Sequence, residues 1–256
     1  MTTNAAHPVF ELENVSFSYP DSPPVLNNIQ FSIRPGERVC ILGANGCGKS
    51  TLLKVLSGLL SPQHGVFRAF GHSVAERDWK DDSFSGDYHR RVGFIFQNPD
   101  VQLFCSTVRE EIAFGLLQQK LTPETIRSRI SDISGMLGIE SLLEKTPFKL
   151  SGGEKKKVTL AAVLVMNPEV LILDEPTNGL APRTQVWLVR LLNALSGAGK
   201  TVIASTHNLE LVPRISDRGI LFSEDHTIAA DAPISKLTGN LELLRSVNLI
   251  DEFYSI

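Results

Sequence analysis

The segment 43–50, GANGCGKS, constrains this chain more than any other, because it fits the pattern GxxxxGK[ST]. It follows a short apolar run, 38–42 (RVCIL), and precedes an apolar segment with helical spacing, 51–60. We therefore expect a buried strand, a glycine-rich loop and a helix. Glycines let the loop backbone aim its N–H groups at phosphate oxygens, and a helix N-terminus adds partial positive charge. This unit predicts a nucleoside triphosphate site.

Two side chains at the end of the loop suit ATP with Mg²⁺. Lys49 is placed to neutralise the β and γ phosphates, and the Ser50 hydroxyl is placed to ligate the metal ion. The predicted nucleotide-binding residues of this segment are Gly43, Ala44, Asn45, Gly46, Cys47, Gly48, Lys49, Ser50 and Thr51. The motif alone does not choose between kinases, GTPases and motors, which all use it.

Strands and helices alternate along much of the chain, which predicts an α/β fold. Alternating apolar and polar residues predict antiparallel strands over 10–17 and 25–33, and short apolar runs predict buried parallel strands. These buried strands are 38–42, 92–96, 170–173 and 202–204, with helices at 51–60, 158–165 and 185–195. The expected core is a P-loop NTPase domain: a mostly parallel sheet with helices on both faces, plus an antiparallel N-terminal β part.

Residues 106–149 interrupt this alternation with helices, predicted over 108–117 and 125–137. We expect them to form an inserted α-helical subdomain. The predicted division is an ATPase core over 1–97 and 158–225, a helical subdomain over 98–157 and a C-terminal extension over 226–256. The leucines of that extension, 241, 243 and 244, predict a helical stripe that packs either against a second tail or on its own domain.

Charge and hydropathy disfavour two classes of function. The net charge of −3 provides no polycation to hold phosphates, so no nucleic-acid partner is expected. The longest apolar runs fall short of the roughly 20 residues that cross a bilayer, and no secretory signal is visible at the N-terminus. Three cysteines without a CxxC pair predict reduced cytosolic thiols. Any membrane crossing is left to another chain.

The run 170–175, VLILDE, predicts a buried strand that ends in two acids. Asp174, directly after the apolar residues, is placed to hold Mg²⁺. Glu175 is then the candidate for polarising the attacking water. An acidic strand end is common by itself, but in a chain with a phosphate loop it indicates nucleotide hydrolysis.

The segment 150–154, LSGGE, resembles the signature of the ATP-binding-cassette (ABC) family, LSGGQ or LSGGE before a helix. A serine, two glycines and a helix N-terminus form a second phosphate-binding surface. The resemblance covers roughly residues 9–225. It implies a head-to-tail dimer in which each signature contacts the ATP of the other subunit, and a homodimer is expected. The residues implied for this contact are Ser151, Gly152, Gly153 and Glu154.

Three further residues match positions of that family. Tyr19 matches the aromatic residue that stacks on adenine. Gln97 matches the glutamine that contacts Mg²⁺ and links the nucleotide to the helical subdomain, and His207 matches the histidine that contacts γ-phosphate. Gln97 and His207 are therefore expected to act in catalysis with Glu175. As isolated residues, a tyrosine or histidine would more often serve packing.

The chain departs from the family at residue 181, where an alanine replaces the usual aspartate of the segment after Glu175. Ala181 cannot make the contacts that the aspartate makes across the dimer. Cys47 replaces a common serine or alanine, so its thiol would lie near the phosphates. There it is expected either to be sensitive to oxidation or to serve only as a small packing residue. Lys155, Lys156 and Lys157 follow the signature and are expected on a solvated helix face.

The segment 96–104, FQNPDVQLF, resembles energy-coupling-factor (ECF) transporter ATPases, especially the cobalt and nickel uptake branch. The resemblance implies that Asp100 faces basic residues of a membrane-embedded subunit, with Leu103 and Phe104 as apolar contacts. The alternative is an ordinary loop in which Asp100 caps a helix starting at Val101.

The expected function is ATP hydrolysis that drives uptake of cobalt or nickel, at the cytoplasmic face of the cell membrane. Two alternatives remain open: an importer ATPase for a vitamin or other small solute, and a soluble ABC ATPase acting on nucleic acid. The cargo cannot be read from this chain because the ATPase does not contact it.

Overall fold

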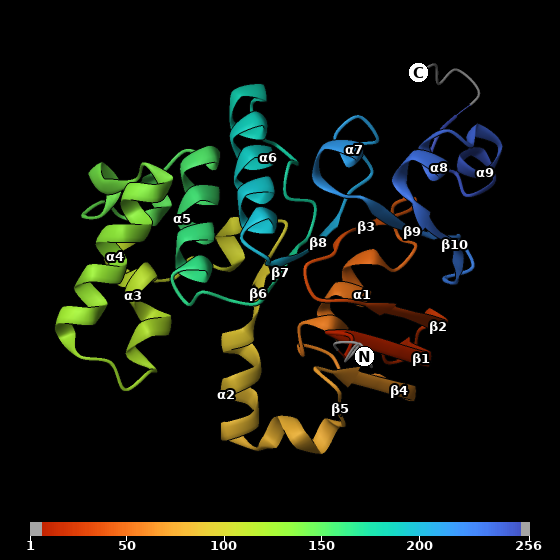
Figure 1. Cartoon of the computed structure of the whole chain (residues 1–256), viewed down its shortest axis with the longest axis horizontal. Coiled ribbons are helices and arrows are strands. Elements are labelled where there is room, and N and C mark those ends of the chain that lie inside the picture. The colour runs from red at the N-terminus through yellow and green to blue at the C-terminus, as the bar shows by residue number, and fades with distance from the viewer. Residues whose placement is uncertain (1–6, 252–256) are drawn as a thin grey trace, which may run out of the picture.

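The strand before the glycine-rich loop, β3 (Arg38–Leu42), lies inside a six-stranded sheet of order β10-β9-β3-β8-β7-β6. The computed structural model describes residues 7–251 (Figure 1). All neighbouring strands in this sheet are parallel except β10, which pairs with β9 in antiparallel fashion. The other strands are β6 (Val92–Ile95), β7 (Val170–Leu173), β8 (Thr201–Ser205), β9 (Arg218–Phe222) and β10 (Ile228–Pro233). The predicted α/β core is confirmed.

A second, antiparallel sheet has the order β2-β1-β4-β5. Its strands are β1 (Phe10–Ser18), β2 (Pro24–Ile33), β4 (His64–Ala69) and β5 (His72–Ser73). In β1 the buried positions alternate with more exposed ones at first, as predicted for a strand with one wet face. The alternation shifts between Leu12 and Val15, where Asn14 has φ 52° and the pairing register changes.

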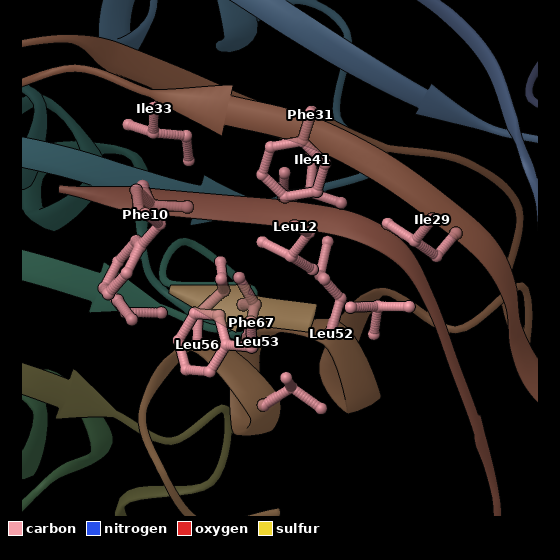
Figure 2. Packing of buried hydrophobic residues seen from close by; sticks show 14 of the residues in the cluster. Phe10, Leu12, Ile29, Phe31, Ile33, Ile41, Leu52, Leu53, Leu56 and Phe67 are labelled. Atoms are coloured by element: carbon pink, nitrogen blue, oxygen red, sulfur yellow. The ribbon is translucent and has the colours of Figure 1, made fainter. Parts of the chain in front are cut away.

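Helix α1 (Lys49–Leu56) lies between the two sheets and carries the end of the glycine-rich loop. Figure 2 shows Leu53 and Leu56 of α1 beside Phe67 of the antiparallel sheet. The same core cluster contains Ile41 from β3 and Phe10 from β1. Because α1 is packed from both sides, its N-terminus is held at a fixed place at the end of β3.

The predicted helical subdomain contains three helices, drawn in green in Figure 1: α3 (Val108–Leu117), α4 (Pro123–Leu137) and α5 (Gly152–Leu164). Three short 3₁₀ turns accompany them: η2 (Pro99–Val101), η3 (Glu140–Leu142) and η4 (Pro147–Lys149). Thr122 caps α4 and Pro123 is its first residue, two positions before the predicted start at 125, and Gly138 ends it in the left-handed conformation.

The segment between β5 and β6 holds elements for which the sequence offered no prediction, η1 (Glu76–Lys80) and α2 (Asp82–Arg91). Tyr88 is the one buried residue of α2, so this helix has no apolar stripe to reveal it. Trp79 packs against Tyr88 with ring centroids 4.8 Å apart, and the Tyr88 hydroxyl donates to the Leu56 carbonyl. These contacts join the segment to α1.

The remaining helices are α6 (Pro182–Gly197), α7 (Val212–Ile215), α8 (Ile234–Thr238) and α9 (Leu241–Ser246). Leu244 is buried in a cluster with Leu42, Val212 and Leu237, and Leu241 and Leu243 pack against that cluster. The tail therefore follows the second of the two expected arrangements and packs on its own domain.

The predicted division into core, subdomain and extension stays a prediction, but two of its boundaries fall inside structural units. Helix α5 runs across the boundary at 157/158. The hairpin of β9 and β10 spans the boundary at 225/226, and its turn is closed by a hydrogen bond from the Ser223 N–H to the Thr227 carbonyl at 3.0 Å. Across residues 7–251, no helix is long and apolar enough to cross a membrane.

Candidate functional site

The glycine-rich loop turns sharply between β3 and α1 because three of its residues have left-handed backbones. Gly43, Gly46 and Gly48 have φ values of 147°, 85° and 111°. A Cβ atom at position 48 would lie 2.4 Å from the Val25 carbonyl oxygen, so this position has no room for a side chain. The loop thus depends on glycine both for its conformation and for its close packing on β2.

Lys49 is 6% exposed and curls back over the loop. Its ammonium group donates to the carbonyls of Gly43 at 2.8 Å and Ala44 at 2.9 Å. The charge is therefore held above the loop by two backbone oxygens, at the place where the sequence predicts phosphate.

A pocket of about 320 Å³ opens at this loop and gathers residues from five parts of the chain. Its lining consists of Val25, Asn45, Gly46, Gly48, Lys49, Ser50, Thr51, Gln97, Glu175, Asn178 and His207. The predicted phosphate loop, Gln97, Glu175 and His207 are thus brought together, although Asn45 and His207 are 162 positions apart in the sequence (207 − 45). Parallel strands place their carboxyl ends at one edge of the sheet, which explains this convergence.

Asp174 and Glu175 lie at the end of β7, 6% and 7% exposed. Ser205 at the end of the adjacent strand β8 connects them. Its hydroxyl donates to Asp174 Oδ1 at 2.6 Å and accepts from the Glu175 N–H at 2.9 Å. Sequence reasoning missed Ser205; the available signal was a polar residue that ends a buried strand next to the acidic one.

Glu175 has a left-handed backbone, with φ 41°, which is uncommon for a residue with a side chain. Its Oε1 lies 2.9 Å from Nδ1 of His207, whose side chain is half exposed at the pocket. The carboxylate accepts a hydrogen bond from the Nδ1–H of His207, so Nε2 is the second ring nitrogen, which accepts a hydrogen bond in the neutral imidazole and donates one in the protonated imidazole. This pair can orient a polar ligand or move a proton.

The donors predicted for Mg²⁺ are the Ser50 hydroxyl, the Gln97 amide oxygen and the Asp174 carboxylate. Ser50 and Gln97 line the pocket, whereas Asp174 is not one of its lining residues and directly precedes the lining residue Glu175. This all-oxygen set fits the preference of Mg²⁺ for hard ligands and a few protein donors. Within residues 7–251, no cluster of three or more His, Cys, Asp or Glu offers a different metal site.

Tyr19 lies next to the phosphate loop. Its hydroxyl is 3.4 Å from Thr51 Oγ1, and its ring stands at 88° to that of Phe17 with centroids 5.1 Å apart. The residue is 36% exposed, so part of the ring remains open to solvent, as stacking on a base requires.

Cys47 is 3% exposed, and a Cβ atom at Gly43 would lie 2.6 Å from its sulfur. Burial raises the pKa of the Cys47 thiol, which disfavours the reactive thiolate. Of the two expectations for this residue, the packing role agrees with the structure. The backbone of Cys47 is also held from outside the loop, since its carbonyl lies 3.1 Å from Nδ1 of His226 in the β9–β10 turn.

The signature segment forms the start of α5, with Ser151 as its N-cap. Ser151 and Glu154 form a capping box: the Ser151 hydroxyl and N–H both approach Glu154 Oε2, at 2.7 and 2.9 Å. The hydrogen bond from Ser151 lowers the pKa of Glu154. Ser151 and Gly152 are exposed and take no part in lining the pocket at Lys49. The signature therefore presents a separate polar surface.

Two expectations about the segment 96–104 are wrong. Leu103 is 3% exposed and belongs to the subdomain core, so it is unavailable as an apolar contact. Asp100 does not cap a helix; Asn98 caps η2 and accepts from the Asp100 N–H at 2.9 Å. Phe104, by contrast, is 61% exposed and stacks edge-on with Phe114 of α3, with ring centroids 4.8 Å apart.

The expectation of a solvated face for Lys155, Lys156 and Lys157 is also wrong. All three side chains are buried or half-buried, because this turn of α5 faces the loop after β6 and the neighbouring helices. A sequence window shows three charges in a row, but it does not show which segments pack around them.

Ala181 is the N-cap residue of α6 and provides no side-chain hydrogen bond to that helix. The aspartate that the family has at this position would provide such an acceptor. The departure therefore removes a helix cap as well as a potential contact across a dimer.

Comparisons with known proteins agree with the site. The chain is 43% identical over 249 residues to the nickel import ATP-binding protein NikO of Rhodobacter capsulatus, covering 96% of this chain and 97% of that protein. It is 38% identical to the energy-coupling factor transporter ATP-binding protein EcfA of Methanothermobacter thermautotrophicus, covering 94% of this chain and 76% of that protein.

Among solved structures, the chain is also similar to ATP-binding proteins of the ABC type. The structure of cbiO1 from Clostridium perfringens, part of the ABC transporter complex cbiONQ, has a TM-score of 0.81 at 34% identity and covers 94% of this chain and 95% of cbiO1. An ATP-binding cassette solved as a dimer in a post-hydrolysis state, bound to ADP and Pi, has a TM-score of 0.79 at 26% identity and covers 88% of this chain and 98% of that chain.

The sequence profile of the family described as "ABC transporter" matches residues 26–178, more than half of the chain. This range contains the phosphate loop, Gln97, the signature segment and the acidic end of β7. With its mixed α/β architecture and the pocket that these segments form, the chain belongs to the ABC transporter family as an ATPase whose hydrolysis is coupled to transport.

Proposed function

We propose that this chain is the ATP-hydrolysing subunit of an ECF-type importer and energises uptake of cobalt or nickel through membrane-embedded partner subunits. The observation that carries the proposal is the position of Gln97: its side chain lines the nucleotide pocket, and seven residues later the same segment exposes Phe104. A single short segment thus reaches from the reaction site to an apolar surface.

In the reaction, Lys49 and the loop N–H groups bind the phosphates, and Tyr19 stacks on adenine. Ser50, Gln97 and Asp174 would hold Mg²⁺, which supplies neutralisation of phosphate charge. Glu175 orients the attacking water and accepts its proton, and protonated His207, held by Glu175 through Nδ1, donates from Nε2 to the γ-phosphate.

The second phosphate-binding surface serves the nucleotide of a second ATPase subunit, and a homodimer is proposed. Ser151, Gly152, Gly153 and Glu154 do not line the chain's own pocket, so this surface acts on a nucleotide held elsewhere. The related cassette that was solved as a dimer with ADP and Pi supports this assembly.

The docking surface for the membrane subunits consists of Val101, Phe104, Phe114 and the adjoining Asp100. Val101, Phe104 and Phe114 are 67%, 61% and 46% exposed, the rings of Phe104 and Phe114 are in contact, and exposed large apolar side chains that lie together indicate a binding surface. We place the ATPase at the cytoplasmic face of the membrane on this basis.

Nickel as the cargo is supported by two relatives named nickel import ATP-binding proteins, from Rhodobacter capsulatus and Lactiplantibacillus plantarum. Cobalt rests on the resemblance of segment 96–104 to the cobalt and nickel uptake branch. A vitamin or another small solute is the competing cargo.

The test has two parts. A tagged chain is pulled down from detergent-solubilised membranes of its source cells, and uptake of radioactive nickel and cobalt is measured in cells that carry wild type or Glu175→Gln. We expect a multi-helix membrane protein in the pulldown and loss of metal uptake in the variant. Normal metal uptake by Glu175→Gln, with its expression verified, would contradict metal as the cargo and direct the assay to vitamins.

The docking surface is tested by Phe104→Ser and Phe114→Ser, with Leu59→Ser as control. Leu59 is 48% exposed and lies outside the helical subdomain, so Leu59→Ser removes an exposed apolar side chain that is not part of the proposed docking surface. We expect the two phenylalanine variants to lose the membrane protein from the pulldown and the control to retain it. Equal retention by all three would refute docking at this surface.

A further inference from the structure

The first turns of α5 join the signature to the loop that follows β6. Lys155 donates to Asp100 Oδ1 at 2.6 Å, and Lys156 donates to the backbone carbonyls of Phe96 at 3.1 Å and Gln97 at 3.4 Å. These bonds connect residues 55 to 60 positions apart in the sequence. Two consecutive lysines of one helix therefore hold both ends of the segment 96–100.

Lys156 is the more unusual of the two because it is 2% exposed and has no carboxylate within ion-pair distance among the described residues. Burial lowers its pKa to about 8, against an opposing effect of Asp174. Burying an ammonium group away from an acid is costly. A methionine of similar length would fill the same space without this cost, so the donor itself needs an explanation.

The carbonyls that Lys156 binds flank the peptide unit that carries the Gln97 side chain into the nucleotide pocket. Five residues before Lys156 on the same helix is the N-cap Ser151, which begins the exposed signature surface. A displacement of 96–97 therefore either breaks the bonds of Lys156 or moves the start of α5 with it.

We propose that Lys156 is a positioning residue for ATP hydrolysis, which ties Gln97 to the signature helix so that the two move as one unit. The proposal rests on the proposed roles of Gln97 and Ser151. It goes beyond them because it assigns the mechanical link between the two sites to a single side chain. Lys155, through Asp100, fastens the same segment on its solvent side.

The experiment compares Lys156→Met, which removes the donor, with Lys156→Arg, which keeps donors at the same place. Lys236→Met on α8 is the matched control, because Lys236 is exposed and its loss changes the net charge equally. Each full-length variant is assayed for kcat and KM of ATP hydrolysis, nucleotide affinity, melting temperature and amide hydrogen exchange over 96–104.

We expect Lys156→Met to lower kcat by about 10- to 100-fold, since misplacement of a catalytic group by 1 Å has this order of effect. Nucleotide affinity and melting temperature should stay near wild type, while exchange over 96–104 becomes faster. Lys156→Arg should recover most of the rate, and Lys236→Met should resemble wild type in every measurement.

Two outcomes would overturn the proposal. One is a wild-type kcat for Lys156→Met; the other is a loss of melting temperature that accounts for the whole loss of rate, without rescue by arginine. Glu175→Gln and Ser151→Arg, assayed in the same series, report on the proposed site itself. If those variants hydrolyse ATP normally, the proposed function fails, whereas a normal rate in Lys156→Met alone overturns only the role of Lys156.

Discussion

Nδ1 of His207 lies 2.9 Å from Oε1 of Glu175, and the two residues follow the adjacent parallel strands β8 and β7. The carboxylate is nearly buried, whereas the imidazole is half exposed at the pocket. The carboxylate is the hydrogen-bond acceptor for Nδ1, so a replacement of Glu175 that removes this acceptor also removes a contact that holds His207 in place.

Glu175→Gln should keep ATP binding and lose most of the hydrolysis. The amide cannot accept a proton from water, and general-base or water-orienting groups contribute on the order of 10²–10⁴ in rate. ATP affinity by fluorescence titration and phosphate release by the purified protein check this. Phosphate release at the wild-type rate would show that Glu175 is not the base.

Lys49→Ala should have a different effect from Glu175→Gln, with weak nucleotide binding as the primary defect. The ammonium group is already held above the loop by the Gly43 and Ala44 carbonyls, so its removal takes away a fixed positive charge. Calorimetric titration with ATP measures the loss. Lys236→Met, which removes a remote exposed lysine, serves as the charge control.

Ser151→Arg should abolish hydrolysis but leave ATP binding to the separated subunit intact. Ser151 is exposed and does not line the chain's own pocket, so its effect should fall on a nucleotide bound by a second subunit. Equilibrium binding at low protein concentration and hydrolysis at high concentration separate the two properties.

Mixing Ser151→Arg with Lys49→Ala sharpens the test of this geometry. The mixed dimer has one site with both substitutions and one site with neither, so activity should return if each site can hydrolyse ATP independently. Absence of recovery in verified mixed dimers would mean either strict coupling of the sites or failure of the proposed geometry.

Ala181→Asp should stabilise the protein by about 0.5–2 kcal/mol, because α6 has no side-chain cap at its N-terminus. Urea unfolding measures the free energy change. Ala181→Leu, which adds bulk without an acceptor, should give no such gain. An equal effect of both substitutions would show that helix capping is not responsible.

Asp217 makes the stability of the folded protein depend on pH in the acid range. Its hydrogen bond with Arg38 lowers the pKa of the carboxyl below the ordinary value of 3.8. A group whose pKa is depressed in the fold stabilises above its unfolded pKa and loses this effect as pH falls through its folded pKa. Asp217→Asn should therefore lower stability near pH 7 and differ less from wild type below pH 3.8. A difference that does not change with pH would contradict this.

Sequence patterns predict the site well where local chemistry specifies local structure. The loop at 43–48 needs left-handed glycines, and Thr122 before Pro123 specifies the start of α4, so both were predictable from neighbouring residues. The buried strands were predictable because residues such as those of β7 are apolar without interruption.

Features that depend on contacts distant in sequence were not predictable in this way. Lys156 is buried because the Phe96 and Gln97 carbonyls lie above it, and no local pattern encodes that meeting. Leu103 and Phe104 are adjacent and both apolar, yet one is buried and the other exposed. Their orientation depends on how η2 joins α3, which is a property of the folded subdomain.

Strand β3 pairs with β8 on one side and β9 on the other, and His226 beyond β9 reaches the Cys47 carbonyl of the phosphate loop. The loop is made early during synthesis, whereas the strands that hold it in place are made last. At ordinary rates of translation, the ribosome takes on the order of 10–40 s to pass from β3 to the end of β9. During this interval the phosphate loop exists without the strands that hold it in its final place, so its nucleotide-binding conformation depends on residues synthesised long after it.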